Sequence, residues 1–235
     1  MLYSMCQASE RPAPGEVHVW IAQLDQPASL VVRCERLLSS NELQRADRFR
    51  FPHLRNRFVL GRAALRILLA RYIGLNRERI DFAYAEHGKP SVASGGLEFN
   101  ASHSDSLFAC AITSENEVGL DIEQIRQISD VDSLANRVMS PTELTQWTGL
   151  AEADRFTKFF ACWTRKEAFL KATGEGISSE LRDLTVGFDD TAVIDVSRQD
   201  PVHIGSFQPI PGYAGAVATF RRLDHLRLLD FAFTF

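Results

Sequence analysis

Two acidic residues, Asp121 and Glu123, lie in a stretch that otherwise has the pattern of a buried strand. They are two positions apart, and apolar residues surround them in Val-Gly-Leu-Asp-Ile-Glu (118–123). Because alternate residues of a strand point to the same face, both carboxylates leave the same side of the sheet. Two carboxylates on one face repel each other unless a proton or a cation lies between them. The pair indicates a cation site, although an exposed edge strand with an acidic face would show the same pattern.

A third carboxylate, Glu167, occupies the apolar face of a helix predicted over 155–176. The core-facing stripe of this helix runs at steps of four, three, four and three through Phe156, Phe160, Trp163, Glu167 and Leu170. A buried, ionised carboxylate is unfavourable unless it is paired, hydrogen-bonded or bound to a metal. Lys171, one turn later, offers an i, i+4 ion pair worth about 0.2–0.5 kcal/mol at a helix surface. From this helix alone, the ion pair and a metal ligand explain Glu167 equally well.

Together, the acids of the strand and the helix fit the coordination of a hard cation by oxygen. Mg²⁺ takes oxygen ligands, usually one or two carboxylates together with substrate phosphates. Such a site accounts both for the acid on the apolar stripe and for the repulsive pair on the strand. The residues therefore indicate that Asp121, Glu123 and Glu167 coordinate a hard cation.

A polar segment, Asn-Ala-Ser-His-Ser (100–104), places His103 between two serines. Its composition predicts a turn between two strands, and such turns often only satisfy their own backbone. The functional interpretation is that His103 donates a hydrogen bond to a phosphate. Lys89, between a glycine and a proline, is one of only four lysines in the chain. A lone lysine is usually solvated, so this residue alone indicates little.

The elements that position these residues repeat along the chain. The matched pairs are a strand (16–24 and 117–125), a helix start (40–49 and 140–147), a long helix (57–72 and 155–176) and a late strand (108–112 and 213–219). Because their order is preserved, we predict an α+β fold of two similar halves, 1–116 and 117–235, related by pseudo-two-fold symmetry. The active site should lie in the cleft between the halves, where ligands commonly bind.

Composition and charge exclude several classes of protein. The 235 residues are 45% hydrophobic, with no apolar run of signal-peptide or membrane-spanning length, so we expect a cytoplasmic protein without membrane contact. The four cysteines lie far apart, which argues against a zinc site or a disulfide framework. The net charge of −4 conceals a segment, 33–79, with twelve arginines and four acids. This basic segment indicates an anionic partner, which could be nucleic acid, a phosphorylated small molecule or an acidic protein.

The strand and helix motifs, taken in order, resemble a known family. Val-Gly-Leu-Asp-Ile-Glu followed by Trp-Thr-Arg-Lys-Glu-Ala-Phe-Leu-Lys (163–171) is similar to the paired signatures of the 4′-phosphopantetheinyl transferases. His-Gly-Lys-Pro (87–90), the 100–104 segment and the arginine-rich helix at 57–66 resemble the larger, surfactin-type members, which are single-chain pseudo-dimers. The tryptophan and the Lys-Glu-Ala form resemble the W/KEA branch. Basic positions that are often lysine in relatives are Arg45 and Arg48 here.

The resemblance implies an activity and a set of residue roles. A serine of an apo acyl or peptidyl carrier protein would attack the β-phosphorus of coenzyme A, releasing adenosine 3′,5′-bisphosphate. Mg²⁺ would be held by the three acids, Lys171 would contact the pyrophosphate, and Glu167, directly or through a water, would be the general base, although a metal-bound water is the alternative. His103 would join Glu167 and Lys171 as a catalytic residue. The expected coenzyme A contacts are Arg45, Arg48, Arg57, Lys89, Ser102, His103 and Lys171.

Two other functions are weighed against the transferase. A nucleic-acid-binding module could use the arginines and aromatics of 45–57, but it would leave the three acids unexplained and the chain is acidic overall. A family member kept only as a binding protein would not need the intact acids and Lys171. We therefore expect coenzyme A and a carrier protein as partners, with no nucleic acid. We also expect a monomer, because the second half supplies what a partner subunit otherwise would.

Overall fold

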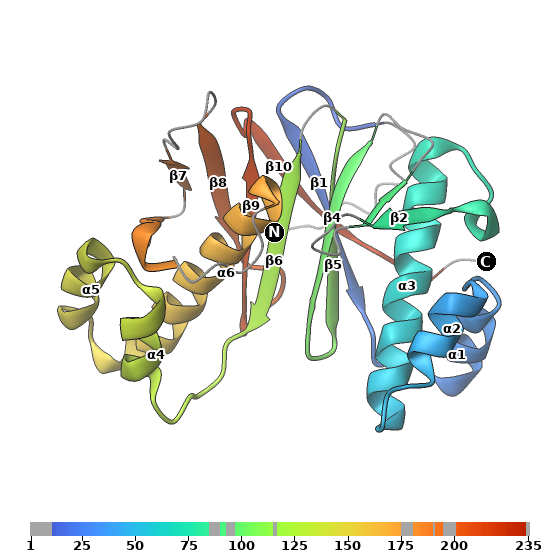
Figure 1. Ribbon diagram of the computed structural model, residues 1–235, viewed down its shortest axis with the longest axis horizontal. Coiled ribbons are helices and arrows are strands. Elements are labelled where there is room, and N and C mark those ends of the chain that lie inside the picture. Colours follow the sequence, from blue (N-terminus) through green and yellow to red (C-terminus); the bar gives the residue numbers. More distant parts are fainter. Residues whose placement is uncertain are drawn as a thin grey trace.

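Two four-stranded sheets face each other, and helices cover the outer face of each (Figure 1). The computed structural model describes residues 11–84, 90–92, 97–114, 117–174, 181–189, 191–194 and 201–233. The mixture of sheets and long helices confirms the predicted α+β class. No helix in these ranges combines the length and the apolar character needed to cross a bilayer.

Among the described residues, each half of the chain has one strand, then three α-helices, then further strands, of which the first half has four and the second has three before the last strand of the chain. The first half contains β1 (Glu16–Gln23), α1 (Ala28–Glu35), α2 (Ser40–Ala46), α3 (Pro52–Ile73), β2 (Phe82–Tyr84), β3 (Pro90–Val92), β4 (Glu98–Ser104) and β5 (Leu107–Thr113). The second contains β6 (Val118–Gln124), α4 (Val131–Val138), α5 (Pro141–Thr148), α6 (Arg155–Thr173), β7 (Thr191–Ile194), β8 (Val202–Phe207) and β9 (Tyr213–Thr219). The predicted similarity of the two halves is thereby confirmed.

The last strand, β10 (His225–Asp230), returns to the first sheet. It pairs in parallel with β1, so the sheet orders are β10-β1-β5-β4 and β6-β9-β8-β7. The pairs β1–β5, β4–β5, β6–β9 and β8–β9 are antiparallel. The end of the chain thus crosses from the second half to the first, and the division at 116/117 stays a prediction.

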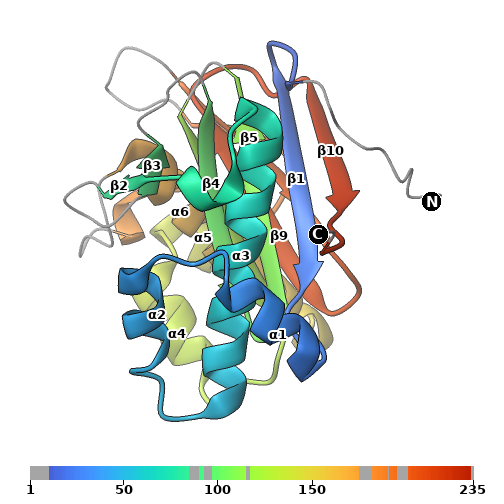
Figure 2. The same cartoon turned by 90° about the vertical axis from the view of Figure 1, so that its right-hand side faces the viewer.

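The strands β1, β5, β6 and β9 are buried on both faces because each sheet lies between helices and the other sheet. Apolar residues of β1, β5, β6 and β9 meet between the sheets, including Val19, Ala109, Leu120 and Val217. The opposite face of the first sheet packs against α3, as Figure 2 shows, and the opposite face of the second packs against α6. Burial on both faces explains the almost continuous apolar runs of β1 and β5.

Matching end signals define the helices of both halves. A capping box begins α2 (Ser39 with Glu42) and α5 (Ser140 with Glu143), and in each the serine side chain accepts from the backbone N–H three residues on. Both long helices end at a glycine in the left-handed conformation, Gly74 after α3 and Gly174 after α6. The helix predicted from residue 57 begins earlier, at Pro52, because proline suits the first helical position.

A close approach of α6 to β6 brings the two main motifs together. A Cβ atom at Gly119 would overlap the carbonyl oxygen of Ala168 and lie 2.5 Å from the backbone nitrogen of Ala172. Glycine is therefore the residue type that permits this helix-to-strand distance. Asp121 and Glu123 share the strand face of Gly119, so they point toward α6.

Candidate active site at the junction of the two sheets

The edge strands β4 and β6 are joined by side chains rather than by a backbone ladder. Every second residue of β4 accepts a hydrogen bond from a backbone N–H of β6. The three pairs are Asn100 Oδ1 with Leu120 N (3.1 Å), Ser102 Oγ with Ile122 N (3.4 Å) and Ser104 Oγ with Gln124 N (3.1 Å). The prediction of a turn at 100–104 is therefore wrong, because these polar side chains satisfy the neighbouring strand and the turn follows at Asp105, whose φ is 48°.

The same serines orient the two strand acids. Ser102 Oγ donates to Asp121 Oδ1 at 2.8 Å, and Ser104 Oγ donates to Glu123 Oε2 at 2.6 Å. Each hydroxyl thus accepts from the backbone of β6 and donates to a carboxylate of the same strand. One half of the chain holds the acids of the other half in place.

Lys171 forms an ion pair with a strand acid at this junction. Its Nζ atom lies 2.7 Å from Asp121 Oδ1, 3.1 Å from the carbonyl oxygen of Leu120 and 3.5 Å from Ser102 Oγ. The lysine side chain is about a third exposed, whereas that of Asp121 is buried. Because the ammonium group of Lys171 is still partly exposed, it can also bind an anionic ligand.

Glu167 lies among the other charged groups with one oxygen unsatisfied. Its side chain is buried, and within the described residues neither Glu167 Oε1 nor Asp121 Oδ2 has a hydrogen-bond partner. Burial raises the pKa of Glu167, and the charges of Asp121 and Glu123 raise it further, against the lowering effect of Lys171. The pKa of Glu123 is also raised, first by burial and then by Asp121, while its bond from Ser104 opposes the shift. The site holds more negative charge than its own residues compensate.

The donor chemistry of the three acids fits a hard divalent cation. Two unsatisfied, buried carboxylate oxygens are the groups that such an ion would bind. Among the residues the structure describes, no three His, Cys, Asp or Glu side chains are already grouped closely enough to hold a metal. Ligation by Asp121, Glu123 and Glu167 together would therefore require their side chains to converge further.

His103 belongs to the same electrostatic neighbourhood. Its pKa is lowered, first by the protein atoms crowded around the ring and then by the charge of Lys171; Asp121 opposes this shift and Arg45 adds to it. A lowered pKa keeps the imidazole neutral near pH 7, when one ring nitrogen donates and the other accepts. His103 is nevertheless exposed, so its ring can reach a bound molecule.

The three arginines predicted to contact coenzyme A have different environments. Arg45 lies near His103, with its guanidinium 5.5 Å from the centroid of the Phe58 ring, while Arg48 is exposed in the turn after α2. Arg57 is engaged by two acids, at 2.7 Å from Asp25 Oδ1 and 2.7 Å from Asp105 Oδ1. The hydrogen bond with Asp25 contributes most to raising the pKa of Arg57. A phosphate at Arg57 would have to compete with these two carboxylates.

The structure thus gathers seven of the predicted site residues and adds two that sequence reasoning did not assign. Those brought together are Arg45, Ser102, His103, Asp121, Glu123, Glu167 and Lys171. Asn100 and Ser104 are the additions, and the alternation of polar residues at 100, 102 and 104 is the signal that could have revealed a strand. Lys89 lies outside the described residues.

Profiles of two protein families match the chain. The "4′-phosphopantetheinyl transferase superfamily" profile covers residues 117–218, and the "4′-phosphopantetheinyl transferase, N-terminal" profile covers residues 23–115. Each profile contains part of the site, because the first includes β6 and α6 and the second includes β4.

Named transferases are similar over most of the chain. The 4′-phosphopantetheinyl transferase HetI of Nostoc sp. is 42% identical over 75% of this chain and 76% of its own length. The 4′-phosphopantetheinyl transferase Sfp of Bacillus subtilis is 29% identical over 77% of this chain and 81% of its own. A crystal structure of a holo-(acyl-carrier-protein) synthase from Bacillus anthracis, in complex with CoA (3′,5′-ADP), is 28% identical over 44% of this chain and 93% of its own, with a TM-score of 0.31.

Proposed function

Because this chain belongs to the 4′-phosphopantetheinyl transferase superfamily, we propose that it transfers the 4′-phosphopantetheine group of coenzyme A to a serine of an apo acyl or peptidyl carrier protein. The second product is adenosine 3′,5′-bisphosphate. The observation that carries the proposal is the buried group of Asp121, Glu123 and Glu167 beside Lys171, at the junction of β4, β6 and α6. With a divalent cation bound to these acids, the arrangement would suit the pyrophosphate of coenzyme A.

The reaction needs charge stabilisation and positioning more than covalent help from the enzyme. The carrier serine oxygen forms a bond to the β-phosphorus, and the bond from that phosphorus to the bridging oxygen breaks. The electrons of the broken bond remain on the 5′-phosphate of the bisphosphate. Lys171, which is partly exposed beside Asp121, would donate to the pyrophosphate oxygens, and neutral His103 would donate a further hydrogen bond.

Glu167 is our candidate for accepting the proton of the carrier serine. Oε1 of Glu167 has no protein partner among the described residues, so it can accept that proton directly or through a water. Asp121, Glu123 and Glu167 would also hold Mg²⁺, which when bound would neutralise charge on the pyrophosphate. Ser102 and Ser104 keep the two strand acids oriented for that role.

The proposed reaction is tested by intact-mass measurement of carrier proteins. The purified chain is incubated with coenzyme A, Mg²⁺ and each of several apo carriers. We expect at least one carrier to gain the mass of one phosphopantetheine group, and a carrier whose acceptor serine is replaced by alanine to gain none. Binding of coenzyme A without modification of any carrier would contradict the proposed activity.

The pH at which activity is lost on acidification, the acid limb of the pH profile, should depend on the magnesium concentration. The pKa values of Glu123 and Glu167 are both raised, so as the pH falls their ionised forms are lost at a higher pH than for an ordinary glutamate. A divalent cation binds only the deprotonated acids and therefore competes with protons. Profiles of kcat/KM against pH should show the acid limb moving to lower pH as Mg²⁺ is raised. A limb that stays fixed over a hundredfold range of Mg²⁺ would contradict ligation by these acids.

A basic surface with exposed aromatics lies next to the site and suits an acidic carrier. Phe49 and Phe51 are 38% and 51% exposed, and Arg45, Arg48 and Arg50 are exposed around them. Positive charge at this rim would speed encounter with an acidic protein and make it sensitive to salt. This use accounts for the basic segment 33–79 without invoking nucleic acid.

Reversing one charge of this surface should weaken carrier recognition. For Arg48→Glu we expect the carrier KM to rise about 3- to 10-fold at low salt with little change in kcat, and the difference to shrink as salt is added. Arg137→Glu, on exposed α4 in the other half, is the matched control and should leave KM unchanged. Equal effects of the two variants, or a salt-independent KM, would show that the rim does not face the carrier.

A monomer is sufficient for the proposed activity. The site takes β4 from the first half and β6 and α6 from the second half of one chain. We therefore expect the active species to be a single chain in the cytoplasm, without nucleic acid or membrane as a partner. Activity per chain should accordingly not depend on enzyme concentration.

A further inference from the structure

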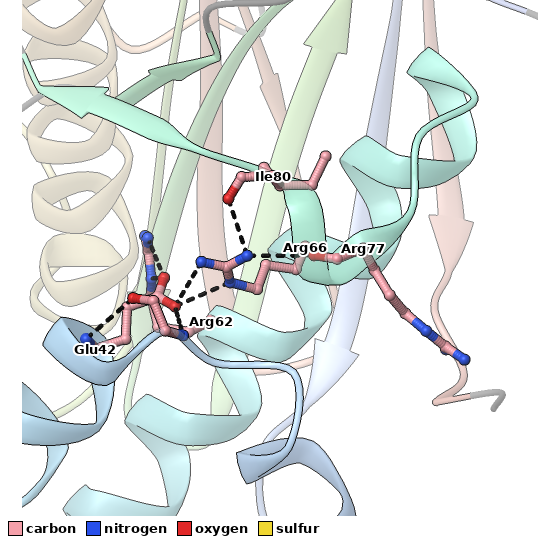
Figure 3. A network of polar contacts seen from close by, with 6 residues as sticks. Glu42, Arg62, Arg66, Arg77 and Ile80 are labelled. Carbon is pink, nitrogen blue, oxygen red and sulfur yellow. Dashed lines mark hydrogen bonds and ion pairs between the residues drawn. The ribbon is translucent and has the colours of Figure 1, made fainter.

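A buried acid links a capping box to the long helix in the first half (Figure 3). Glu42 accepts from Arg62 at 2.6 Å and from Arg66 at 2.8 Å. Arg66 also donates to the carbonyl oxygens of Ile80 at 2.9 Å and Arg77 at 3.2 Å. The acid at the start of α2 and the segment after α3 are thus both held by one cation of α3.

The second half contains the same arrangement with a lysine. Lys166 Nζ lies 2.8 Å from Glu143 Oε2, and both side chains are fully buried. Lys166 also donates to the carbonyl oxygens of Leu181, at 2.8 Å, and Leu184. Glu143 Oε1 in turn accepts from the backbone N–H of Val186 at 2.7 Å. We call the Glu143–Lys166 pair, with the carbonyls that it holds, the C-terminal clamp, and the Glu42–Arg66 pair the N-terminal clamp.

The two clamps occupy equivalent places in the repeated fold. Glu42 and Glu143 are the third helical residues of their capping boxes. Arg66 and Lys166 each precede the left-handed glycine at the end of their helix, Gly74 or Gly174, by the same number of residues. A device that appears twice with different cations is a feature of the fold and not an accident of one sequence.

Stability alone does not account for the fully buried pair. Removing two charges from water offsets much of their mutual attraction, and apolar residues in place of such a pair are often as stable. The pair instead specifies the position of α6. Lys166 can donate to Glu143 and to the two carbonyl oxygens together only when α6 has one rotation about its axis and one position along that axis. Glu167 is the next residue, and helical geometry carries that setting to it and to Lys171.

We propose, on the basis of the proposed function, that Glu143 and Lys166 are positioning residues that set α6 against β6, so that Glu167 and Lys171 meet the strand acids. Neither residue touches the site itself, since Lys166 is directed to the segment 181–186. The first half provides a comparison, because it has the clamp without the acids. There Ile67 and Arg71 stand at the positions of Glu167 and Lys171, and the Arg71 guanidinium lies 5.3 Å from the Trp20 ring.

The test removes the clamp charge and separates positioning from stability. The double variant Glu143→Gln with Lys166→Met leaves no unpaired charge, and its folding is checked by circular dichroism and thermal unfolding. Mn²⁺ binding is measured by electron paramagnetic resonance with coenzyme A present and no carrier, and kcat and the coenzyme A KM are measured separately. We expect Mn²⁺ affinity and kcat each to fall at least tenfold, with KM changing less than threefold.

Two further variants complete the test. The single variant Lys166→Arg, which has the cation of the first half and keeps Glu143, should retain Mn²⁺ affinity and kcat within threefold of the unaltered protein. Arg66→Met breaks the N-terminal clamp and should lower thermal stability without changing Mn²⁺ affinity or kcat. A folded double variant with unaltered Mn²⁺ affinity and kcat would overturn the positioning role. If the double variant does not fold, Glu143→Gln with Lys166→Gln, which also leaves no unpaired charge, carries the same two outcomes. Failure of the proposed function is distinguishable, since the unaltered protein would then modify no carrier.

Discussion

Replacing Glu167 with glutamine is expected to lower kcat by about 10²- to 10³-fold or more while leaving the protein folded. The substitution keeps the size of the side chain but removes the charge that would bind a cation and the oxygen that would accept a proton. Glu167 lies near Asp121 and Glu123 and has an unsatisfied oxygen, so the loss is chemical and not a loss of packing. Steady-state kinetics on an apo carrier measure the effect.

The same substitution should raise thermal stability at neutral pH. The pKa of Glu167 is raised in the folded protein, so ionisation destabilises the folded state once the pH exceeds the pKa of the unfolded chain. Glutamine removes that penalty, and the stability difference should vanish at low pH, where the acid is protonated in both states. Glu98→Gln, on the exposed part of β4, makes the same charge change away from the site and should alter neither property. Near-normal kcat in Glu167→Gln would remove Glu167 from the mechanism.

Replacing Gly119 with alanine is expected to have the largest effect on stability. The new methyl group would overlap backbone atoms of Ala168 and Ala172, which cannot turn aside as a flexible side chain can. Either β6 and α6 separate or the strand bends, at a cost of about 1–3 kcal/mol or more. Because β6 carries Asp121 and α6 carries Lys171, separation should also reduce kcat by at least about tenfold.

The control for this prediction is another glycine with room for a side chain. At Gly149, the nearest atom to an added Cβ is a carbonyl oxygen at 3.5 Å, and the backbone is not left-handed. Urea unfolding of the two alanine variants should show a large loss of unfolding free energy only at position 119. If both variants unfold and react alike, close contact between α6 and β6 is not what the glycine provides.

Local patterns predicted the elements that carry the acids. Alternation around Asp121 indicated β6, the stripe through Leu170 indicated α6, and the helix starts expected at 40–49 and 140–147 correspond to α2 and α5. These signals are periodicities and end signals that a short window of sequence contains. The stripe proved too narrow a description, since α6 is buried on nearly every side from Thr164 to Leu170 and Trp163 is only half-buried.

Features that depend on distant partners were not predictable in this way. A turn was predicted for the residues of β4 because polar side chains in a strand usually face water. In the structure these side chains form hydrogen bonds with β6 instead. The pairing of β10 with β1 joins residues about two hundred positions apart, and no local pattern records it. The ion-pair partners of Arg57 and Lys166 are likewise determined by the fold. The sequence could identify the two charged residues but not their partners.

The central claim is that the acids at the junction of the sheets carry out phosphopantetheine transfer. The most direct measurement quantifies holo-carrier and adenosine 3′,5′-bisphosphate in the same reaction, for the unaltered protein and for Glu167→Gln at equal concentrations of folded enzyme. We predict the two products in a one-to-one ratio from the unaltered protein and almost none of either from the variant. Equal rates of product formation by the two proteins, or bisphosphate release without a modified carrier, would contradict the account.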